Sequence, residues 1–104
     1  MVVKNGLVHI VFFWLNNPDS EVDRAALNLG LIGLSQIDLV KVAYIGTPAD
    51  THREVIDSSY SFAITLVFES NKEQTEYQTH PEHLEFIANC KHLWKKVQVY
   101  DIDC

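Results

Sequence analysis

The stretch GLVHIVFFWL, residues 6–15, constrains the fold of this chain more than any other segment. It is rich in β-branched and aromatic residues, a composition typical of a β-strand. Side chains alternate between the two faces of a strand, and here both faces are apolar except at His9. A strand that is apolar on both faces is normally covered on both faces. The sheet that contains this strand therefore needs two covering layers.

The rest of the chain supplies one of these layers. Turn residues and hydrophobic spacing predict a helix from about Glu21 to Leu34, strands over 38–46 and 59–70, a short helix in 70–78, a helix from Pro81 to about Lys95, and a strand over 96–102. No conformation is predicted for the polar residues 47–58. The order is the ferredoxin-like βαββαβ arrangement of an α+β protein, a four-stranded antiparallel sheet with its helices on one face.

Inside the first predicted helix, several small or apolar residues recur near helical spacing. They are Val22, Ala25, Ala26, Leu29, Ile32 and Gly33. Gly30 and Gly33 weaken this helix, and Gly33 is expected close to its end.

The other face of the sheet needs a different cover. The chain is 47% hydrophobic and 21% charged, and a domain of this length buries only about 60–68% of the surface that its unfolded form exposes. The same face of a second copy is the simplest cover. We therefore expect a homodimer in which two sheets pack into an eight-stranded α+β barrel, with residues 1–104 forming one domain.

The charge pattern argues against some classes of partner. The net charge is −6, and the eight Lys and Arg residues are scattered, with Lys95-Lys96 as the only adjacent pair. Without a basic stripe we expect neither nucleic-acid binding nor binding to membrane surfaces. The start of the chain shows no leader pattern and the apolar run from Leu7 to Leu15 is too short to span a bilayer, so a cytoplasmic protein is expected. Cys90 and Cys104 have no metal or disulfide spacing and are expected to be reduced.

The stretch YQTHPEHLEF, residues 77–86, contains the candidate chemistry. A residue that precedes proline is biased away from the α region, and proline suits the first position of a helix, so a helix break is expected at His80-Pro81. Thr79 and Glu82 also fit the spacing of a capping box, which would make His80 helical instead. His80 is expected to be exposed, as a cap or without a role.

His83 lies just inside the new helix. Apolar residues follow it at spacings of 3, 4, 7 and 11, namely Phe86, Ile87, Cys90 and Trp94, so His83 is expected to point toward the core. It is either an ordinary core histidine or part of a site. His9 is the one polar residue of its strand, and burying an imidazole without a partner is costly. If His9, Tyr77 and His83 converge within apolar walls, they form the usual kind of small-molecule pocket.

His80 and His83 are three residues apart, a spacing that can occur in metal sites. Zinc requires three or four convergent ligands, whereas this pair spans a helix break and has no cysteine nearby. Glu82 and Glu85 point elsewhere on the helix. We expect no metal and no cofactor.

The segments HIVFF at 9–13, Y-x-x-H-P-x-H-x-x-F at 77–86 and VYDI at 99–102 resemble the stress-responsive A/B barrel domain (Dabb) family. The similarity extends over roughly His9 to Ile102. It implies a dimeric α+β barrel, in agreement with the fold expected from the residue pattern.

The resemblance also implies a chemistry. The family includes plant olivetolic acid cyclases, which close linear polyketides by aldol chemistry. On that likeness Tyr77 and His83 are the catalytic residues: His83 removes a proton beside a carbonyl as general base, and Tyr77 holds the enolate oxygen. The expected pocket lining is His9, Val11, Phe13, Phe86 and Ile87, with His80 in a secondary position.

Two classes of function remain open. The first is a homodimeric binding protein for a small apolar or aromatic ligand, linked to stress responses only through the family name. The second is a cofactor-independent enzyme, either a cyclase that uses Tyr77 and His83 or a monooxygenase of the wider barrel superfamily. A purely structural dimer is a third reading. The discriminating feature is whether His9, Tyr77 and His83 converge on one open cavity.

Overall fold

The computed structural model describes residues 2 and 4–104. Within these residues the elements follow in the order β1 (Leu7–Leu15), α1 (Glu21–Ser35), β2 (Val40–Gly46), β3 (Phe62–Phe68), α2 (Asn71–Gln78), α3 (Pro81–Cys90), the 3-10 turn η1 (Lys91–Leu93) and β4 (Trp94–Asp103). This confirms the βαββαβ order, with α2 as the extra short helix. Among the described residues, no helix has the length and apolar character needed to cross a membrane.

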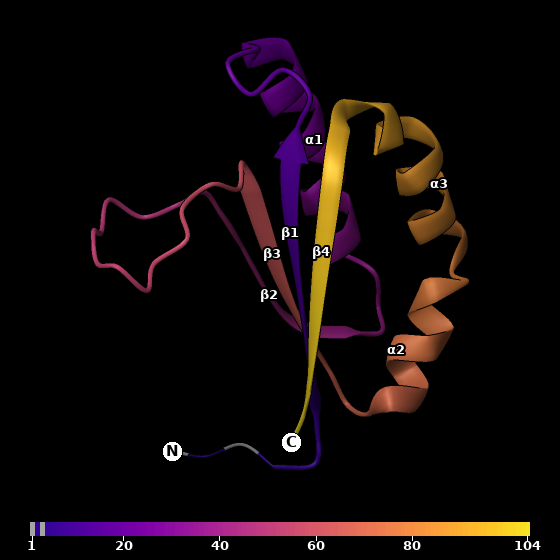
Figure 1. Ribbon diagram of the computed structural model, residues 1–104. Coiled ribbons are helices and arrows are strands. Elements are labelled where there is room, and N and C mark those ends of the chain that lie inside the picture. Colours follow the sequence, from indigo (N-terminus) through magenta and orange to yellow (C-terminus); the bar gives the residue numbers. More distant parts are fainter. Residues whose placement is uncertain (1, 3) are drawn as a thin grey trace.

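The four strands form one antiparallel sheet in the order β2-β3-β1-β4. All three helices lie on one side of the sheet, and the long connection over residues 47–61 extends away on the other side (Figure 1). In the register of the sheet, His9 near the start of β1 faces Asp101 of β4 and Leu66 of β3. The ferredoxin-like fold expected from the sequence is thus confirmed.

Burial along β1 follows the pleat of the strand. The side chains that face the helices are buried, and they are Leu7, His9, Val11, Phe13 and Leu15. The side chains of the opposite face are only partly buried, and they are Val8, Ile10, Phe12 and Trp14. One face of the sheet is therefore covered by helices, while the other is apolar and open within this single chain.

The buried face of α1 differs from the set of residues singled out by spacing. Leu27, Leu31 and Leu34 face the core, whereas Leu29 and Val22 are 69% and 78% exposed. The helix itself begins as expected, since Ser20 caps it by accepting a hydrogen bond from the Asp23 amide. The expected helix is confirmed, but its apolar stripe at Val22 and Leu29 lies on the outside. The sequence EVDRAALNLGLIGLS is apolar around most of its circumference, so spacing alone did not identify the inner face.

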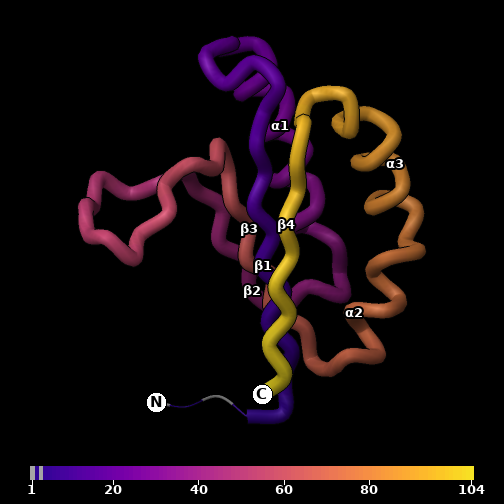
Figure 2. The backbone as a smooth tube through the Cα atoms, in the orientation of Figure 1, coloured from indigo at the N-terminus to yellow at the C-terminus, as the bar shows by residue number. Residues whose placement is uncertain are grey.

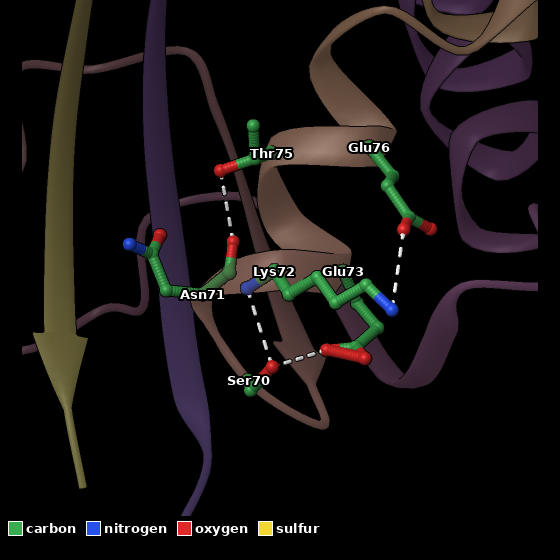
Figure 3. Close-up of polar contacts among 6 residues, drawn as sticks. All are labelled: Ser70, Asn71, Lys72, Glu73, Thr75 and Glu76. Atoms are coloured by element: carbon green, nitrogen blue, oxygen red, sulfur yellow. Dashed lines mark hydrogen bonds and ion pairs between the residues drawn. The ribbon is translucent and has the colours of Figure 1, made fainter.

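Helix α2 begins at the N-cap Ser70. Ser70 accepts a hydrogen bond from the Lys72 amide over 3.2 Å and donates one to the carboxylate of Glu73, as Figure 3 shows. The bond from Ser70 is the main reason that the pKa of Glu73 is lowered. Thr75 donates to the carbonyl oxygen of Asn71 over 2.9 Å (Figure 3). These contacts fix the start of the helix that carries Tyr77 at its other end.

The break between α2 and α3 forms at His80, as expected. His80 has extended backbone angles and its Nδ1 accepts a hydrogen bond from the Glu82 amide, so it is the N-cap of α3. The alternative capping box from Thr79 does not form because Thr79 ends α2 instead. His80 is partly buried rather than exposed, with 27% of its side chain accessible.

Helix α3 is shorter than expected. It ends at Cys90, a 3-10 turn follows, and Trp94 is already the first residue of β4. Trp94 was therefore wrongly placed on the stripe of this helix. The strand expected over 59–70 is also shorter, from Phe62 to Phe68, although the Ser61 amide still donates a hydrogen bond to the Phe13 carbonyl of β1.

The end of the chain runs back beside the start of β1 (Figure 2). Gly6 and Cys104 exchange two backbone hydrogen bonds of 3.1 and 2.8 Å. These bonds extend the β1–β4 pairing beyond the strand ends. Both Cys90, which is buried, and Cys104, which is exposed, are free thiols.

Candidate functional site

A cavity of about 350 Å³ lies between the sheet and helices α2 and α3. Its walls include every residue expected to be catalytic or pocket-lining, namely His9, Val11, Phe13, Tyr77, His83, Phe86 and Ile87. Further lining residues are Leu34, Ile64, Gln74, Gln78, Trp94, Val97, Val99 and Asp101. The volume is within the range of pockets that hold small molecules. The three polar residues whose convergence the sequence left open thus border a single cavity.

The cavity has a polar end and an apolar end. His9 and Phe13 both line the cavity from β1. They are four residues apart, which corresponds to about 13 Å along a strand. Opposite them on β4 lie Asp101 and Val97. Along α3, His83 comes one turn before Phe86. Polar side chains therefore gather near the start of β1, and apolar ones near its end.

His9 is held by a carboxylate. Its Nδ1 lies 2.5 Å from Oδ1 of Asp101, and its side chain is only 7% exposed. A carboxylate accepts hydrogen bonds, so Nδ1 carries a proton and Nε2 is the nitrogen free for other contacts. The ring also makes edge contacts with Tyr77 and Phe68, with centroids 6.1 and 6.2 Å away. Asp101 thereby fixes both the tautomer and the orientation of a buried imidazole.

His83 is held by the backbone. Its Nδ1 lies 3.1 Å from the carbonyl oxygen of Gln78, which can only accept, so the neutral ring again has its proton on Nδ1. Burial is the main cause that lowers the pKa of His83, with smaller contributions from the nearby His9 and His80. The ring is consequently neutral at pH 7, and its Nε2 lone pair is able to accept a proton.

Tyr77 completes the polar end. It is 2% exposed, and its ring lies 4.7 Å from that of His83, centroid to centroid. Burial raises its pKa above the usual value of 10.0, so the phenol keeps its proton at neutral pH. Among the described residues, no side-chain nitrogen or oxygen is both fully buried and without a partner. The hydroxyl of Tyr77, which has no bond to another described residue, therefore opens onto the cavity as a hydrogen-bond donor.

The apolar end is built from aromatic rings. Phe13 lies against Trp94, with centroids 5.0 Å apart, and meets the edge of Phe86 at 6.3 Å. Phe86 in turn stacks on Trp94 at 5.7 Å and 26°. Three packed rings of this kind give a rigid wall that suits an aliphatic or aromatic group.

His80 does not line the cavity. Its Nδ1 caps α3 and its Nε2 lies 4.0 Å from Asp38 on the outside of the molecule. Its place in the site is therefore indirect, through the start of the helix that carries His83. Among residues 2 and 4–104, no three His, Cys, Asp or Glu side chains come together as the ligands of a metal ion.

The sequence reading missed Asp101. The antiparallel pairing of β1 with β4 could have indicated this residue. This pairing places an aspartate of the last strand opposite His9 of the first strand. Gln78 was missed for a different reason: its carbonyl is a backbone group, and its role depends on where α2 ends.

Solved structures with the same fold show how the chain compares with known proteins. A Dabb family protein from Mesorhizobium loti has 21% identity and a TM-score of 0.78, over 95% of this chain and 96% of that one. A dimeric ferredoxin-like protein of unknown function from Thermobifida fusca has 18% identity and a TM-score of 0.77, over 100% and 95%. A hydroxynitrile lyase from Passiflora edulis has 21% identity and a TM-score of 0.77, over 96% and 94%.

These likenesses show the fold. No protein with a curated description matches the chain. The model of the family described as Stress responsive A/B Barrel Domain matches residues 7–104, which is nearly the whole sequence. The chain therefore belongs to the stress-responsive A/B barrel domain family, Dabb.

Proposed function

We propose that this protein is a homodimer that binds a small molecule with an apolar body and a carbonyl or hydroxyl group. The observation that carries the proposal is the cavity of about 350 Å³ with its polar groups at one end and its aromatic wall at the other. A few placed polar groups in an otherwise apolar lining are typical of binding pockets. Tyr77 donates a hydrogen bond to the head group, and Phe13, Phe86 and Trp94 contact the body.

The open face of the sheet supports the homodimer. Across β2 and β4 this face exposes large apolar side chains, with Val42 at 45%, Tyr44 at 67%, Tyr100 at 56% and Ile102 at 49%. An apolar patch that runs across a whole sheet is characteristic of an interface. The structural neighbour from Thermobifida fusca is described as dimeric. Two such faces packed together complete an eight-stranded barrel and leave each cavity on the helix side of its own sheet.

Native mass spectrometry of gently purified protein tests the proposal directly. We expect a dimer whose mass exceeds that of two denatured chains by the mass of retained ligand. The variant Ile87→Trp fills the cavity from α3 and should release this extra mass, whereas Ala88→Trp, on the exposed side of the same helix, should keep it. Extra mass that survives Ile87→Trp would locate the ligand elsewhere. A protein without retained mass that also fails to bind acetophenone in calorimetry would overturn the proposal.

A second candidate, a cofactor-independent enzyme, is favoured by one specific observation. A neutral His83 and a protonated Tyr77 border the same cavity as the His9–Asp101 pair. In this scheme Nε2 of His83 takes a proton from the carbon beside a carbonyl group. The C–H electron pair forms the enolate, and the Tyr77 hydroxyl donates a hydrogen bond to its oxygen. The enolate carbon then attacks a second carbonyl to form the aldol C–C bond, the π electrons of that carbonyl move to its oxygen, and the resulting alkoxide takes the proton back from Nε2 of His83.

The first step of this scheme is testable without the natural substrate. In D₂O the protein should catalyse the exchange of deuterium into the methyl group of acetophenone. Proton NMR measures this exchange as the loss of the methyl signal. His83→Ala should abolish the exchange, and Tyr77→Phe should slow it by about 100-fold or more, in the range reported for loss of one oxyanion donor. Exchange that proceeds equally well in His83→Ala rules out this role. Because a structural neighbour is a hydroxynitrile lyase, cyanide release from mandelonitrile is the parallel assay, and oxygen uptake tests the monooxygenase reading.

A further inference from the structure

The cavity shares a wall with a groove on the outside of the helices. This groove, of about 370 Å³, runs between α1 and α3, and Gly30, Gly33 and Asn89 contribute to its sides. Leu34 and Phe86 line both the groove and the cavity. These two side chains therefore stand between the two spaces, and the Phe86 ring belongs to the aromatic wall of the cavity.

The position of Phe86 depends on a glycine. A Cβ atom added at Gly30 would lie 2.9 Å from Cδ1 and Cε1 of Phe86 and 2.9 Å from Sγ of Cys90. Contacts this short do not occur between real side chains, so only glycine lets α1 and α3 approach this closely. A glycine inside a helix destabilises it by about 1 kcal/mol relative to alanine. At Gly30 the absence of a side chain allows the close packing of α1 against α3. At Gly33, three residues further along, an added Cβ meets nothing within 4 Å.

Phe86 also contacts two aromatic rings that line the cavity. Its ring stacks on Trp94 at 5.7 Å and contacts the edge of Phe13 at 6.3 Å. The backbone of α1 at Gly30 blocks movement of the ring toward the groove, while the cavity offers room on the other side. Any group added at Gly30 will accordingly press the Phe86 ring into the cavity.

We propose that Phe86 and Leu34 form a partition that limits the length of the ligand, and that Gly30 sets where the partition stands. The proposal rests on the proposed binding function and specifies its ligand class. The ligand is a neutral molecule with a carbonyl head group at Tyr77 and an unbranched apolar tail that runs along β1 toward Phe86. The partition closes the far end of the cavity, and tails longer than the distance to it are excluded.

A series of straight-chain 2-alkanones, from 2-pentanone to 2-undecanone, is a suitable probe. Binding to the full chain is measured by calorimetry. In the wild type each added methylene should increase the affinity about fourfold, until the tail meets the partition and the gain stops. In Phe86→Ala this limit should move to longer ketones, because the cavity then joins the groove. In Gly30→Ala it should move to shorter ones, because the ring is pushed inward.

Two further variants keep the test decisive. Gly33→Ala adds the same methyl group to the same helix without a contact, and its limit should equal that of the wild type. Leu34→Ala opens the partition from α1 and should lengthen the limit even if Gly30→Ala does not fold. A contrary result is that the affinity stops increasing at the same tail length in the wild type, Phe86→Ala and Leu34→Ala. That result would overturn the partition and leave the binding function intact.

A different result separates the two proposals. If the wild type binds none of the ketones, the proposed carbonyl ligand is refuted. The effect of Gly30 on the position of the Phe86 ring can then still be measured in the protein without ligand. Nuclear Overhauser contacts between the rings of Phe86 and Trp94 should change in Gly30→Ala and stay the same in Gly33→Ala. Identical contacts in both variants would show that Gly30 does not position Phe86.

Discussion

At the scale of single residues, two histidines in one site are held in the same tautomer by different means. Asp101 accepts from Nδ1 of His9, and the backbone carbonyl of Gln78 accepts from Nδ1 of His83. A side chain can be removed by mutation, whereas a carbonyl cannot. The two imidazoles therefore respond differently to substitution.

Asp101→Ala tests the first of these contacts. Removing the carboxylate leaves a buried imidazole nitrogen without its partner, so the free energy of unfolding should fall by about 1–3 kcal/mol. Nitrogen NMR shifts of His9 should change from one tautomer to a mixture. The matched control is Asp50→Ala, which removes a carboxylate 2.6 Å from His52 on the surface and should leave stability unchanged. If the free energy of unfolding falls equally in both variants, the burial of His9 does not make its contact with Asp101 more stabilising than the surface pair.

His83 gives the stability of the protein a pH dependence. Burial lowers the pKa of His83 in the folded state below its ordinary value of 6.5. Between the folded and the unfolded pKa the unfolded chain binds more protons, so stability is full above pH 6.5 and falls as the pH drops. Urea unfolding at pH 7.5 and pH 5 should show this loss, and His83→Gln should reduce it. A wild type and variant with the same pH dependence would contradict the assignment to His83.

The polar site could be predicted only in part at this scale. His9, Tyr77 and His83 are distinctive residues in an apolar setting, so the sequence drew attention to them. Asp101 lies on a half-exposed edge strand, and nothing local separates it from Asp103, which is two residues away on the same face. Only the strand register, a long-range property, shows which aspartate meets His9.

At the scale of elements, helix α1 shows where periodicity reaches its limit. The strands could be predicted because alternation has a single solution once one face is buried. In α1 two apolar stripes compete, one through Leu27, Leu31 and Leu34 and one through Val22 and Leu29. The choice between them depends on how the helix sits against β1 and β3, which local spacing does not determine. The short α3 is a similar case, because Trp94 pairs with Leu15 at the end of β1.

A pair of leucine substitutions measures this difference on one helix. Leu31 is 0% exposed and Leu29 is 69% exposed, two residues apart. Leu31→Ala should lower the free energy of unfolding by about 2–5 kcal/mol, as expected for a cavity in a core. Leu29→Ala should change it by less than about 0.5 kcal/mol. Chemical denaturation of the two variants gives both values, and the reverse order would mean that α1 is turned about its axis.

At the scale of the whole molecule, the open face of the sheet governs assembly. Tyr44→Glu places a charge on that face, where the side chain is 67% exposed, and should convert the proposed dimer to a monomer. Leu29→Glu places the same charge at a site of similar exposure on the outside of α1 and should leave the dimer intact. Sedimentation velocity distinguishes the two species. A wild type that sediments as a monomer at micromolar concentration would remove the basis for the barrel.

The pairing of β1 with β4 has a consequence for how the chain comes to be folded. His9 and Asp101 are 92 positions apart in sequence, yet they share one hydrogen bond between neighbouring strands. Contacts between such distant segments form slowly, because the chain entropy of closing a long loop is lost before any pairing energy is gained. On the ribosome, β1 is made first and waits for β4 to emerge. The His9–Asp101 contact at the polar end of the cavity can therefore form only after the last strand has been made.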